Sequence, residues 1–350
     1  MNILVWHVHG AWTTSFVHGR HRYLVPVDDE RGPYGLGRAR TYHWPAAAVE
    51  VTPEDVATTD VDVVVAQRPE ELALAASWLG GRRVPIVYVE HNTPKGDVPC
   101  TRHPMADRDD VRLVHVTHFN ELFWDNGSTR TAVIEHGVVP PAAEYTERDL
   151  EIQKIVADAA SNADAAVEQF RIDEAISSIW TIVDALNGYI TANEPVRRGR
   201  VTGTDLLGRF APVAPLDVFG MGVAPLGAGA VTAYDDARQD QMHQLIARRR
   251  LYLHLCRWTS LGLSLIEAML IGLPVVALAV TEAVRAVPAD AGILSTRVDD
   301  LVDGARWLID DPDAAHRIGK AGRDAVRDRY GLDRFLDDWD HLLEETCGSR

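Results

Sequence analysis

The sequence predicts an α/β protein with two doubly wound parallel sheets and a helical hairpin inserted between them. Short apolar runs alternate with amphipathic helical patterns in both halves of the chain, and such alternation favours parallel sheets covered by helices. At 350 residues, the chain is long enough for two domains that each bury a core. Between the halves, the alternation gives way to two consecutive apolar series at helical spacing.

The first half contains a series of predicted strands, each a short run rich in Val, Ile or Leu. Helical patterns separate them, for example at residues 70–79 and 118–124. Ligands of such sheets bind at the carboxyl ends of the strands, so residues that follow the strands are candidates for a site. The predicted strands cover residues 3–9, 61–66, 84–89, 111–116 and 131–134, and Gly10, Gln67, His91 and Thr117 stand at their ends.

The second half repeats this rhythm after a different middle segment. Residues 146–149 can open a helix with a capping box, and the two apolar series that follow predict an antiparallel helical hairpin. Residues 189–192 are a candidate substitute for the first strand of the second sheet. Otherwise the hairpin is an insertion that leaves this sheet short. The other predicted strands cover residues 216–219, 251–255, 275–279 and 292–295.

Composition excludes several classes of protein. The formal net charge of −16 argues against a broad nucleic-acid surface or a strong attraction to anionic lipid. There is no apolar run of about 18 residues and no signal-peptide pattern, so we expect a cytoplasmic protein without stable membrane insertion. The three cysteines, Cys100, Cys256 and Cys347, lie far apart in the sequence and indicate neither a disulfide framework nor a zinc site.

Residues 255–284 carry the most informative pattern, LCRWTSLGLSLIEAMLIGLPVVALAVTEAV. A turn that contains Gly262 precedes a predicted helix, and the N–H groups of Leu263, Ser264 and Leu265 in its first turn lack intrahelical partners. Together with the helix dipole, these groups favour a phosphate. Glu267 follows one turn later and could accept hydrogen bonds from a sugar hydroxyl. A phosphate site next to a site for a sugar diol is the arrangement that binds a nucleotide.

This segment resembles the donor-binding signature of retaining GT-B glycosyltransferases, specifically glycosyltransferase family 4. The family typically has a glutamate, seven further residues, and a second glutamate followed by Ala-Met. Glu267 matches the second glutamate, whereas Thr259 stands in the first position. The resemblance implies a GT-B fold and a hexose donor linked to UDP or GDP. It also implies retention and no divalent metal or other cofactor, and it associates the first acid with the transferred sugar.

The same resemblance implies a diphosphate clamp at the start of the second domain. By spacing, Arg197 matches the family's arginine and Gly203 its glycine, while Thr202 replaces the usual lysine. Arg200 or Arg198 could supply the missing positive charge, because a guanidinium offers two parallel donors to phosphate oxygens. The alternative is a solvated arginine turn beside an acidic domain.

Other candidates stand at strand ends. His91-Asn92 occupies the place where the family usually has His-Asp, which implies that His91 is a catalytic residue that contacts the transferred sugar. Gly10, with Ala11 and Trp12, resembles the glycine loop on the acceptor or sugar side, the alternative being a simple turn from strand to helix. Glu282 corresponds to a family glutamate and is predicted either to bind the acceptor side or to cap the next helix.

The sequence patterns and the resemblance together predict four segments of the chain. Residues 1–140 form an acceptor-side domain, residues 141–194 the hairpin, and residues 195–330 the nucleotide-sugar domain. Residues 331–350 are expected to form a helix that packs back on the first domain, as in GT-B proteins. Within it, residues 333–345 carry an apolar stripe on one helical face, formed by Phe335, Leu336, Trp339, Leu342 and Leu343. Acid pairs such as Asp60 and Asp62 are similar to the Asp-x-Asp metal motif of another glycosyltransferase fold, but they flank a predicted strand. No metal site is therefore predicted.

Residues 144–195 are similar to part of the helical anticodon-binding domain of bacterial methionyl-tRNA synthetases. The similarity covers only about fifty residues and none of the synthetase's catalytic motifs. It leaves RNA binding through the hairpin open as an alternative function, although the acidic charge balance counts against it.

The leading hypothesis is a metal-independent glycosyltransferase that transfers a hexose with retention from a nucleotide diphosphate sugar. The acceptor is unknown and could be a saccharide, a lipid-linked glycan or a small molecule. A second hypothesis is a nucleotide-sugar-binding protein in which Thr259 and Thr202 have reduced or abolished turnover.

Overall fold

The computed structural model describes residues 1–95, 100–145, 190–193 and 203–348, which fall into two compact units. The first unit consists of Met1–Pro140, Thr259–Leu263 and Asp328–Arg350, and the second of Pro141–Trp258 and Ser264–Arg327. The carboxyl-terminal segment therefore belongs to the first unit. The predicted hairpin at 141–194 lies outside the described residues, apart from residues 141–145 and 190–193.

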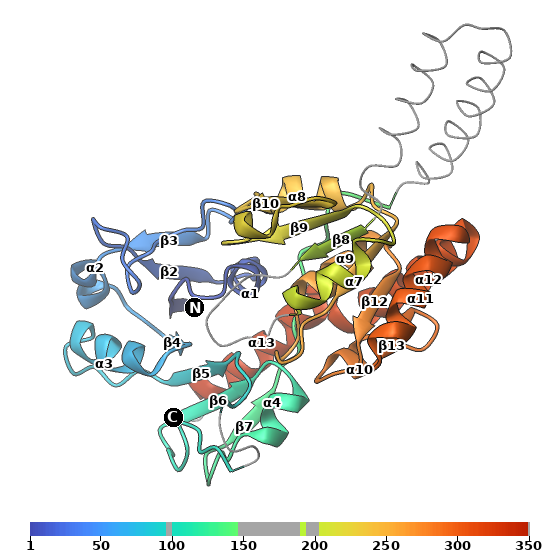
Figure 1. Cartoon of the computed structure of the whole chain (residues 1–350). Coiled ribbons are helices and arrows are strands. Elements are labelled where there is room, and N and C mark those ends of the chain that lie inside the picture. The colour runs from blue at the N-terminus through green and yellow to red at the C-terminus, as the bar shows by residue number, and fades with distance from the viewer. Residues whose placement is uncertain (96–99, 146–189, 194–202, 349–350) are drawn as a thin grey trace, which may run out of the picture. The chain divides into compact units, whose positions relative to one another are not determined.

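The first unit contains a seven-stranded parallel sheet with the order β3-β2-β1-β4-β5-β6-β7, drawn from blue to green in Figure 1. This order reverses between β1 and β4, as in a doubly wound fold. Two of the strands, β2 and β3, were not predicted. The strands are β1 (Asn2–Val5), β2 (Arg22–Pro26), β3 (Ala48–Val51), β4 (Val63–Ala66), β5 (Ile86–Glu90), β6 (Val111–His115) and β7 (Thr131–Val133).

Helices cover this sheet, and the carboxyl-terminal helix contributes most to one core. Phe335 and Trp339 of α13 are fully buried and pack edge-on against Trp12 of α1. This face is the apolar stripe that the sequence predicts for the last helix, and it belongs to the same core cluster as β1, β4 and β5. The helices are α1 (Gly10–Phe16), α2 (Pro53–Thr58), α3 (Pro69–Trp78), α4 (His118–Phe123) and α13 (Leu332–Gly348).

The second unit contains a six-stranded parallel sheet with the order β10-β9-β8-β11-β12-β13. Its central strand β8 (Ile190–Asn193) pairs with β9 and β11, so residues 190–193 supply the strand that the sequence left in question and the sheet is not short. The order again reverses beside the first strand of the sheet. The other strands are β9 (Leu216–Gly220), β10 (Val231–Asp235), β11 (Leu251–His254), β12 (Val275–Leu278) and β13 (Gly292–Ser295).

Helix α9 (Leu263–Ile271) is apolar around most of its circumference and is buried from Leu265 onward. It ends at Gly272, whose φ of +100° favours glycine.

Two contacts tie the chain just before the hairpin region to this unit: Tyr145 N–H donates to the Ile271 carbonyl at 2.7 Å, and Glu144 pairs with Arg323 of α12 at 2.5 Å. The other helices are α7 (Leu207–Phe210), α8 (Gln239–Ile246), α10 (Ala283–Ala286), α11 (Val298–Asp310) and α12 (Pro312–Tyr330), with two short 3₁₀ turns, η1 (Thr204–Leu206) and η2 (Ala224–Leu226).

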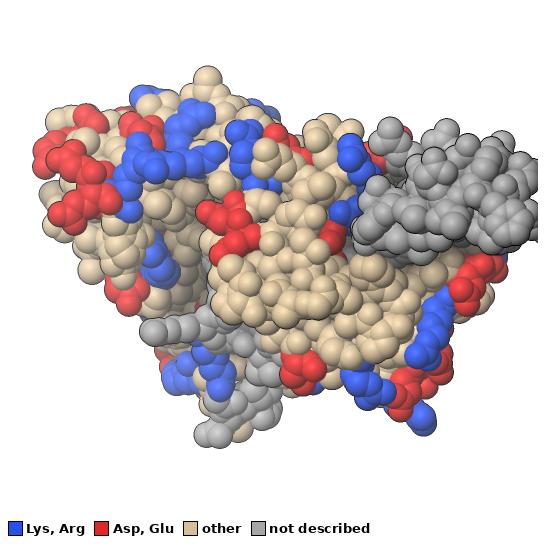
Figure 2. Space-filling view, turned by 45° about the horizontal axis from the view of Figure 1, so that its top comes forward, with Lys and Arg blue, Asp and Glu red and all other residues tan. Residues whose placement is uncertain are grey.

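The described part of the face in Figure 2 shows no continuous basic field. In Figure 2, basic and acidic side chains are interspersed over the described part of the face shown, around a broad area of other residues. Within the described ranges, no helix has both the length and the apolar character needed to cross a membrane.

Candidate functional site

Glu267 lies near the middle of α9, and its side chain is 4% exposed. Helix α8 holds its carboxylate: Gln239 Nε2 donates to Oε1 at 2.8 Å, and His243 Nε2 lies 3.2 Å from Oε2. The histidine contact has the distance of an ion pair but not the angles of a hydrogen bond, so the glutamine is the better aligned partner. The carboxylate is thus fixed in direction, which suits it to accept hydrogen bonds from a ligand.

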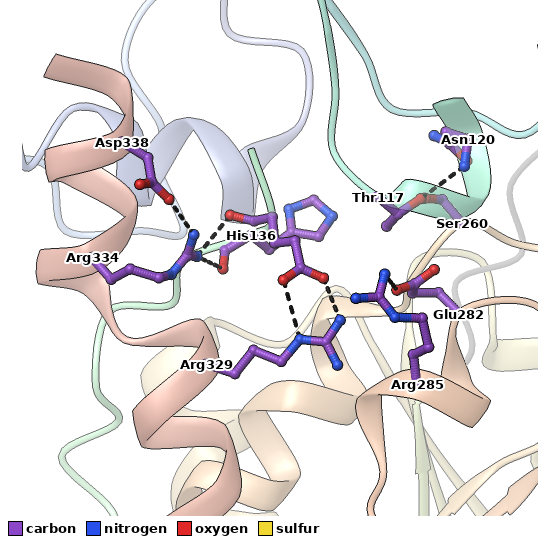
Figure 3. Close-up of polar contacts among 10 residues, drawn as sticks. Thr117, Asn120, His136, Ser260, Glu282, Arg285, Arg329, Arg334 and Asp338 are labelled. Carbon is purple, nitrogen blue, oxygen red and sulfur yellow. Dashed lines mark hydrogen bonds and ion pairs between the residues drawn. The ribbon is translucent and has the colours of Figure 1, made fainter. Parts of the chain in front are cut away.

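The turn before α9 is anchored on both sides. Ser260 is buried, and its Oγ lies 3.0 Å from Thr117 Oγ1, which also caps α4 by accepting the Asn120 N–H at 3.1 Å (Figure 3). Further along, Ser264 Oγ accepts a hydrogen bond from Tyr252 Oη of β11 at 2.9 Å.

The predicted donor-binding residues of this segment divide between the two units. Thr259, Gly262 and Leu263 belong to the first unit, whereas Ser264 and Glu267 belong to the second. Their assignment to a donor site stays a prediction.

The predicted diphosphate clamp is described only at Gly203, because Arg197, Arg200 and Thr202 lie outside the described residues. A Cβ at Gly203 would lie 2.1 Å from the Leu255 carbonyl oxygen and 2.6 Å from the Leu255 Cβ. Its φ is −103°, so space rather than backbone conformation requires glycine here. In this structure Gly203 therefore packs closely against Leu255, the residue that follows β11.

We expect Gly203→Ala to destabilise the protein by about 1–3 kcal/mol, because the added methyl overlaps a backbone carbonyl that cannot rotate away. Gly208→Ala is the matched control, since Gly208 is exposed on α7 with no atom within 4 Å of an added Cβ. Urea denaturation of both variants measures the difference. Equal stability of the two variants would contradict the packing described for Gly203.

His91 follows β5 and is 9% exposed. Three aromatic side chains surround its ring: His9 stacks at 3.9 Å between centroids, His136 stacks at 6.5 Å, and Trp12 meets it edge-on at 5.0 Å. Burial lowers the pKa of His91 well below its ordinary value, and the neighbouring His9 and His136 lower it further. The ring is therefore neutral at physiological pH, with one nitrogen that donates and one that accepts.

Glu90, the last residue of β5, fixes the backbone next to His91. Its Oε1 accepts the Asn92 N–H at 2.6 Å, and its Oε2 lies 3.0 Å from His103 Nε2. Because His103 Nδ1 accepts the Met105 N–H at 3.0 Å, the His103 proton is on Nε2 and points at Glu90. Sequence reasoning missed this buried pair, since nothing in the spacing of Glu90 and His103 marks them as partners.

Gly10 and Trp12 have structural surroundings that the sequence does not reveal. Gly10 begins α1, and a Cβ there would lie 2.7 Å from the ring of Tyr42, so an aromatic side chain fills the space beside it. Trp12 is 1% exposed within the aromatic core. Its ring meets His91 edge-on at 5.0 Å between centroids, and its assignment to the acceptor or sugar side stays a prediction.

Glu282 is buried before α10 and pairs with Arg285 at 3.1 Å. It is the N-cap residue of α10, but its side chain makes no capping hydrogen bond, so both the acceptor-side role and the capping role stay predictions. Thr281 precedes it with a φ of +49°, a left-handed conformation that costs a β-branched residue about 1–2 kcal/mol.

The acid pair at Asp60 and Asp62 has a structural role. Asp62 Oδ2 accepts the Asn2 N–H at 2.6 Å, and the Asp60 carbonyl accepts from the Asn2 side chain at 2.7 Å. These contacts tie the start of β1 to the residues that precede β4. The pair therefore flanks a strand, as the sequence suggests.

Part of the chain matches a known protein family. Residues 229–325, which include Glu267 and Glu282, match the family model described as glycosyl transferases group 1. No curated protein sequence matches the chain.

Several solved structures are similar over the whole chain. Sucrose-phosphate synthase from Thermosynechococcus elongatus is 14% identical with a TM-score of 0.65, and the alignment covers 100% of both chains. Anabaena HepE in complex with UDP-glucose is 16% identical with a TM-score of 0.64, over 99% of this chain and 100% of that one. A glycosyltransferase from Rickettsia africae is 12% identical with a TM-score of 0.62, over 100% and 99% of the two chains.

The chain therefore has the GT-B fold, which confirms the predicted fold class except for the inserted helical hairpin, which stays a prediction. Residues 229–325 match the model of glycosyl transferases group 1, which supports the coarser part of the resemblance. Membership of family 4 and the similarity of residues 144–195 to a synthetase domain stay predictions.

Proposed function

We propose that this protein is a metal-independent glycosyltransferase that transfers a hexose, with retention, from a nucleotide diphosphate sugar to a saccharide, a lipid-linked glycan or a small molecule. The observation that carries the proposal is Glu267, a buried carboxylate directed by Gln239 and His243 within the domain that matches the family model. In this role its two oxygens accept hydrogen bonds from the ribose hydroxyls of the donor.

The other parts of the site stabilise charge and orient the sugar. The free N–H groups at the start of α9 bind the diphosphate, on which negative charge develops as the sugar leaves. His91 hydrogen-bonds the transferred sugar as a neutral ring, so it orients a hydroxyl without adding a charge. Arg197 or Arg200 completes the diphosphate contacts, and Glu282 acts on the acceptor side.

UDP is the first nucleotide to test, because the Anabaena protein of the same fold has been solved with UDP and with UDP-glucose. Isothermal titration of the full chain with UDP and with GDP, in EDTA, measures binding to the donor site. We expect one of the two to bind with a dissociation constant below a millimolar. No binding of either nucleotide at millimolar concentration would refute the proposed donor site.

Thr259 favours a second candidate, a nucleotide-sugar-binding protein with little or no turnover. Its side chain is buried where the family resemblance has a carboxylate, and a hydroxyl cannot supply that negative charge. Mass-spectrometric detection of transfer across panels of nucleotide sugars and acceptors separates the two candidates. Transfer rejects the second candidate, whereas binding of UDP or GDP without any product across the panels favours it.

A further inference from the structure

The segment that carries His136 follows β7 and lies against the carboxyl-terminal part of the chain. Val138 N–H donates to the Tyr330 carbonyl at 3.1 Å. A Cβ at Gly137 would lie 2.3 Å from the Cβ of Phe335, so only glycine lets α13 approach this closely. The backbone on the carboxyl side of His136 is thus fixed by residues almost two hundred positions away in the sequence.

Two arginines of the carboxyl-terminal part of the chain also hold this segment (Figure 3). Arg334 of α13 donates through Nη2 to the carbonyl oxygens of Glu135, at 2.8 Å, and of His136, at 2.7 Å. Its Nη1 pairs with Asp338 one turn further on, at 2.5 Å. Arg329 forms a two-pronged ion pair with the Glu135 carboxylate. The position of His136 therefore depends on the carboxyl-terminal helix.

His136 is one of three imidazoles that form a stack. The rings of His9, His91 and His136 follow one another with interplanar angles of 28° and 29°. They come from three separate places in the first unit, after β1, β5 and β7 respectively. Near-parallel rings do not converge their nitrogens on one point, so the stack has the geometry of packing rather than of metal ligation.

A stack of this kind fixes the plane of its middle ring. His91 is buried beside the rings of His9 and His136 and the edge of Trp12. Rotation of the His91 ring out of its plane is opposed most strongly by His9, whose centroid is 3.9 Å away, since packed side chains leave little free volume. The direction of its hydrogen bonds is set in the same way.

We propose that His9 and His136 are positioning residues that hold His91 in the orientation needed for sugar transfer, and that Arg334 places His136. This proposal rests on the proposed function, in which His91 contacts the transferred sugar. It adds two residues that touch no substrate, and it couples the carboxyl-terminal helix to the chemistry. Neither role follows from the motif around His91.

His136→Ala and Arg334→Ala test the proposal, with Arg334→Lys as the conservative variant. His21→Ala is the matched control: His21 is also buried and also contacts α13, through Asp340 at 2.9 Å, but it lies outside the stack. We expect His136→Ala to lower kcat roughly 10- to 100-fold, as small displacements of an aligned group do. UDP affinity should change less than about twofold, and His21→Ala should change neither quantity.

The second readout does not depend on turnover. In ¹⁵N NMR titrations of the histidine rings, wild-type His91 should titrate below the ordinary histidine pKa, because burial and its two histidine neighbours disfavour the charged form. In His136→Ala the pKa should move back toward the ordinary value, because the ring gains solvent and loses one neighbour. Arg334→Ala should give a smaller shift in the same direction, and Arg334→Lys less again.

These measurements separate the proposal from the proposed function. If wild-type protein binds UDP but transfers no sugar, the function fails, and the NMR titration alone decides whether His136 governs the His91 ring. A folded His136→Ala variant whose His91 titrates as in wild type, or whose kcat is unchanged in an active enzyme, would overturn the positioning role. A shift in the His91 pKa that His21→Ala reproduces would overturn it as well.

Discussion

His91→Ala is expected to lower kcat for sugar transfer by about 100- to 1,000-fold, the usual loss when one preorganised hydrogen-bonding group is removed from a transition state. The expectation follows from the buried, neutral ring that the stack fixes in place. Initial rates with saturating nucleotide sugar and varied acceptor measure the loss. The affinity for UDP, measured by titration, should stay within about threefold of wild type, because the role assigned to His91 concerns the sugar.

His115→Ala provides the control for the loss of a buried histidine. His115 lies fully buried at the end of β6, and burial lowers its pKa to about 4. Its Nε2 contacts Asn126 at 3.0 Å, and it has no place in the stack. The His115→Ala variant should lose as much stability as His91→Ala without a comparable loss of kcat. Equal losses in both variants would show that His91 acts through stability alone.

Glu267→Ala is expected to weaken binding of the nucleotide by at least about 100-fold. Each hydrogen bond from a ribose hydroxyl to this carboxylate is worth roughly 1.5–3 kcal/mol, and the carboxylate can accept two. Titration calorimetry with UDP, or with GDP if that is the nucleotide bound, measures the effect. Glu267→Gln keeps the shape and one acceptor oxygen, so it should lie between the alanine variant and wild type.

Stability needs a separate measurement, because Glu267 has protein partners. Its removal leaves Gln239 Nε2 and His243 without their contacts in a buried setting, at a cost of about 1–3 kcal/mol. Glu71→Gln is the control: Glu71 is fully buried in the first unit and pairs with Arg68. It should lower the melting temperature but leave nucleotide affinity unchanged. If Glu267→Ala binds the nucleotide as tightly as wild type, Glu267 is structural.

Local patterns in the sequence were sufficient for much of the architecture. Val and Ile runs predicted β4, β5, β6 and β12, because fully buried parallel strands are apolar on both faces. The apolar stripe of residues 333–345 predicted a buried helix, and Phe335 and Trp339 are indeed in the core. β2, β3 and β10 were missed: their sequences, RYLVP, AVEV and VTAYD, are short and lie among polar and glycine-rich segments.

The chemistry at single positions was harder to predict, because it depends on neighbours remote in sequence. Gly203 was assigned to a phosphate from its spacing, whereas in the structure it adjoins the Leu255 carbonyl. Trp12 was assigned to a loop beside a ligand, but α1 carries it into a core formed with α13. In both cases the sequence could not show which distant residues lie beside the position.

By itself, the sequence determined the repeated α/β pattern and a helix that places a glutamate one turn after a glycine-containing turn, because these features depend on contacts within a few residues. The tertiary structure alone decided which groups hold that glutamate. It also decided that His9, His91 and His136 form one stack and that Arg334 donates to the backbone carbonyl of His136. Those contacts follow from strand order and from the return of the carboxyl-terminal helix. Hydrophobic periodicity describes only how one element is buried, so it carries no information about which distant elements become neighbours.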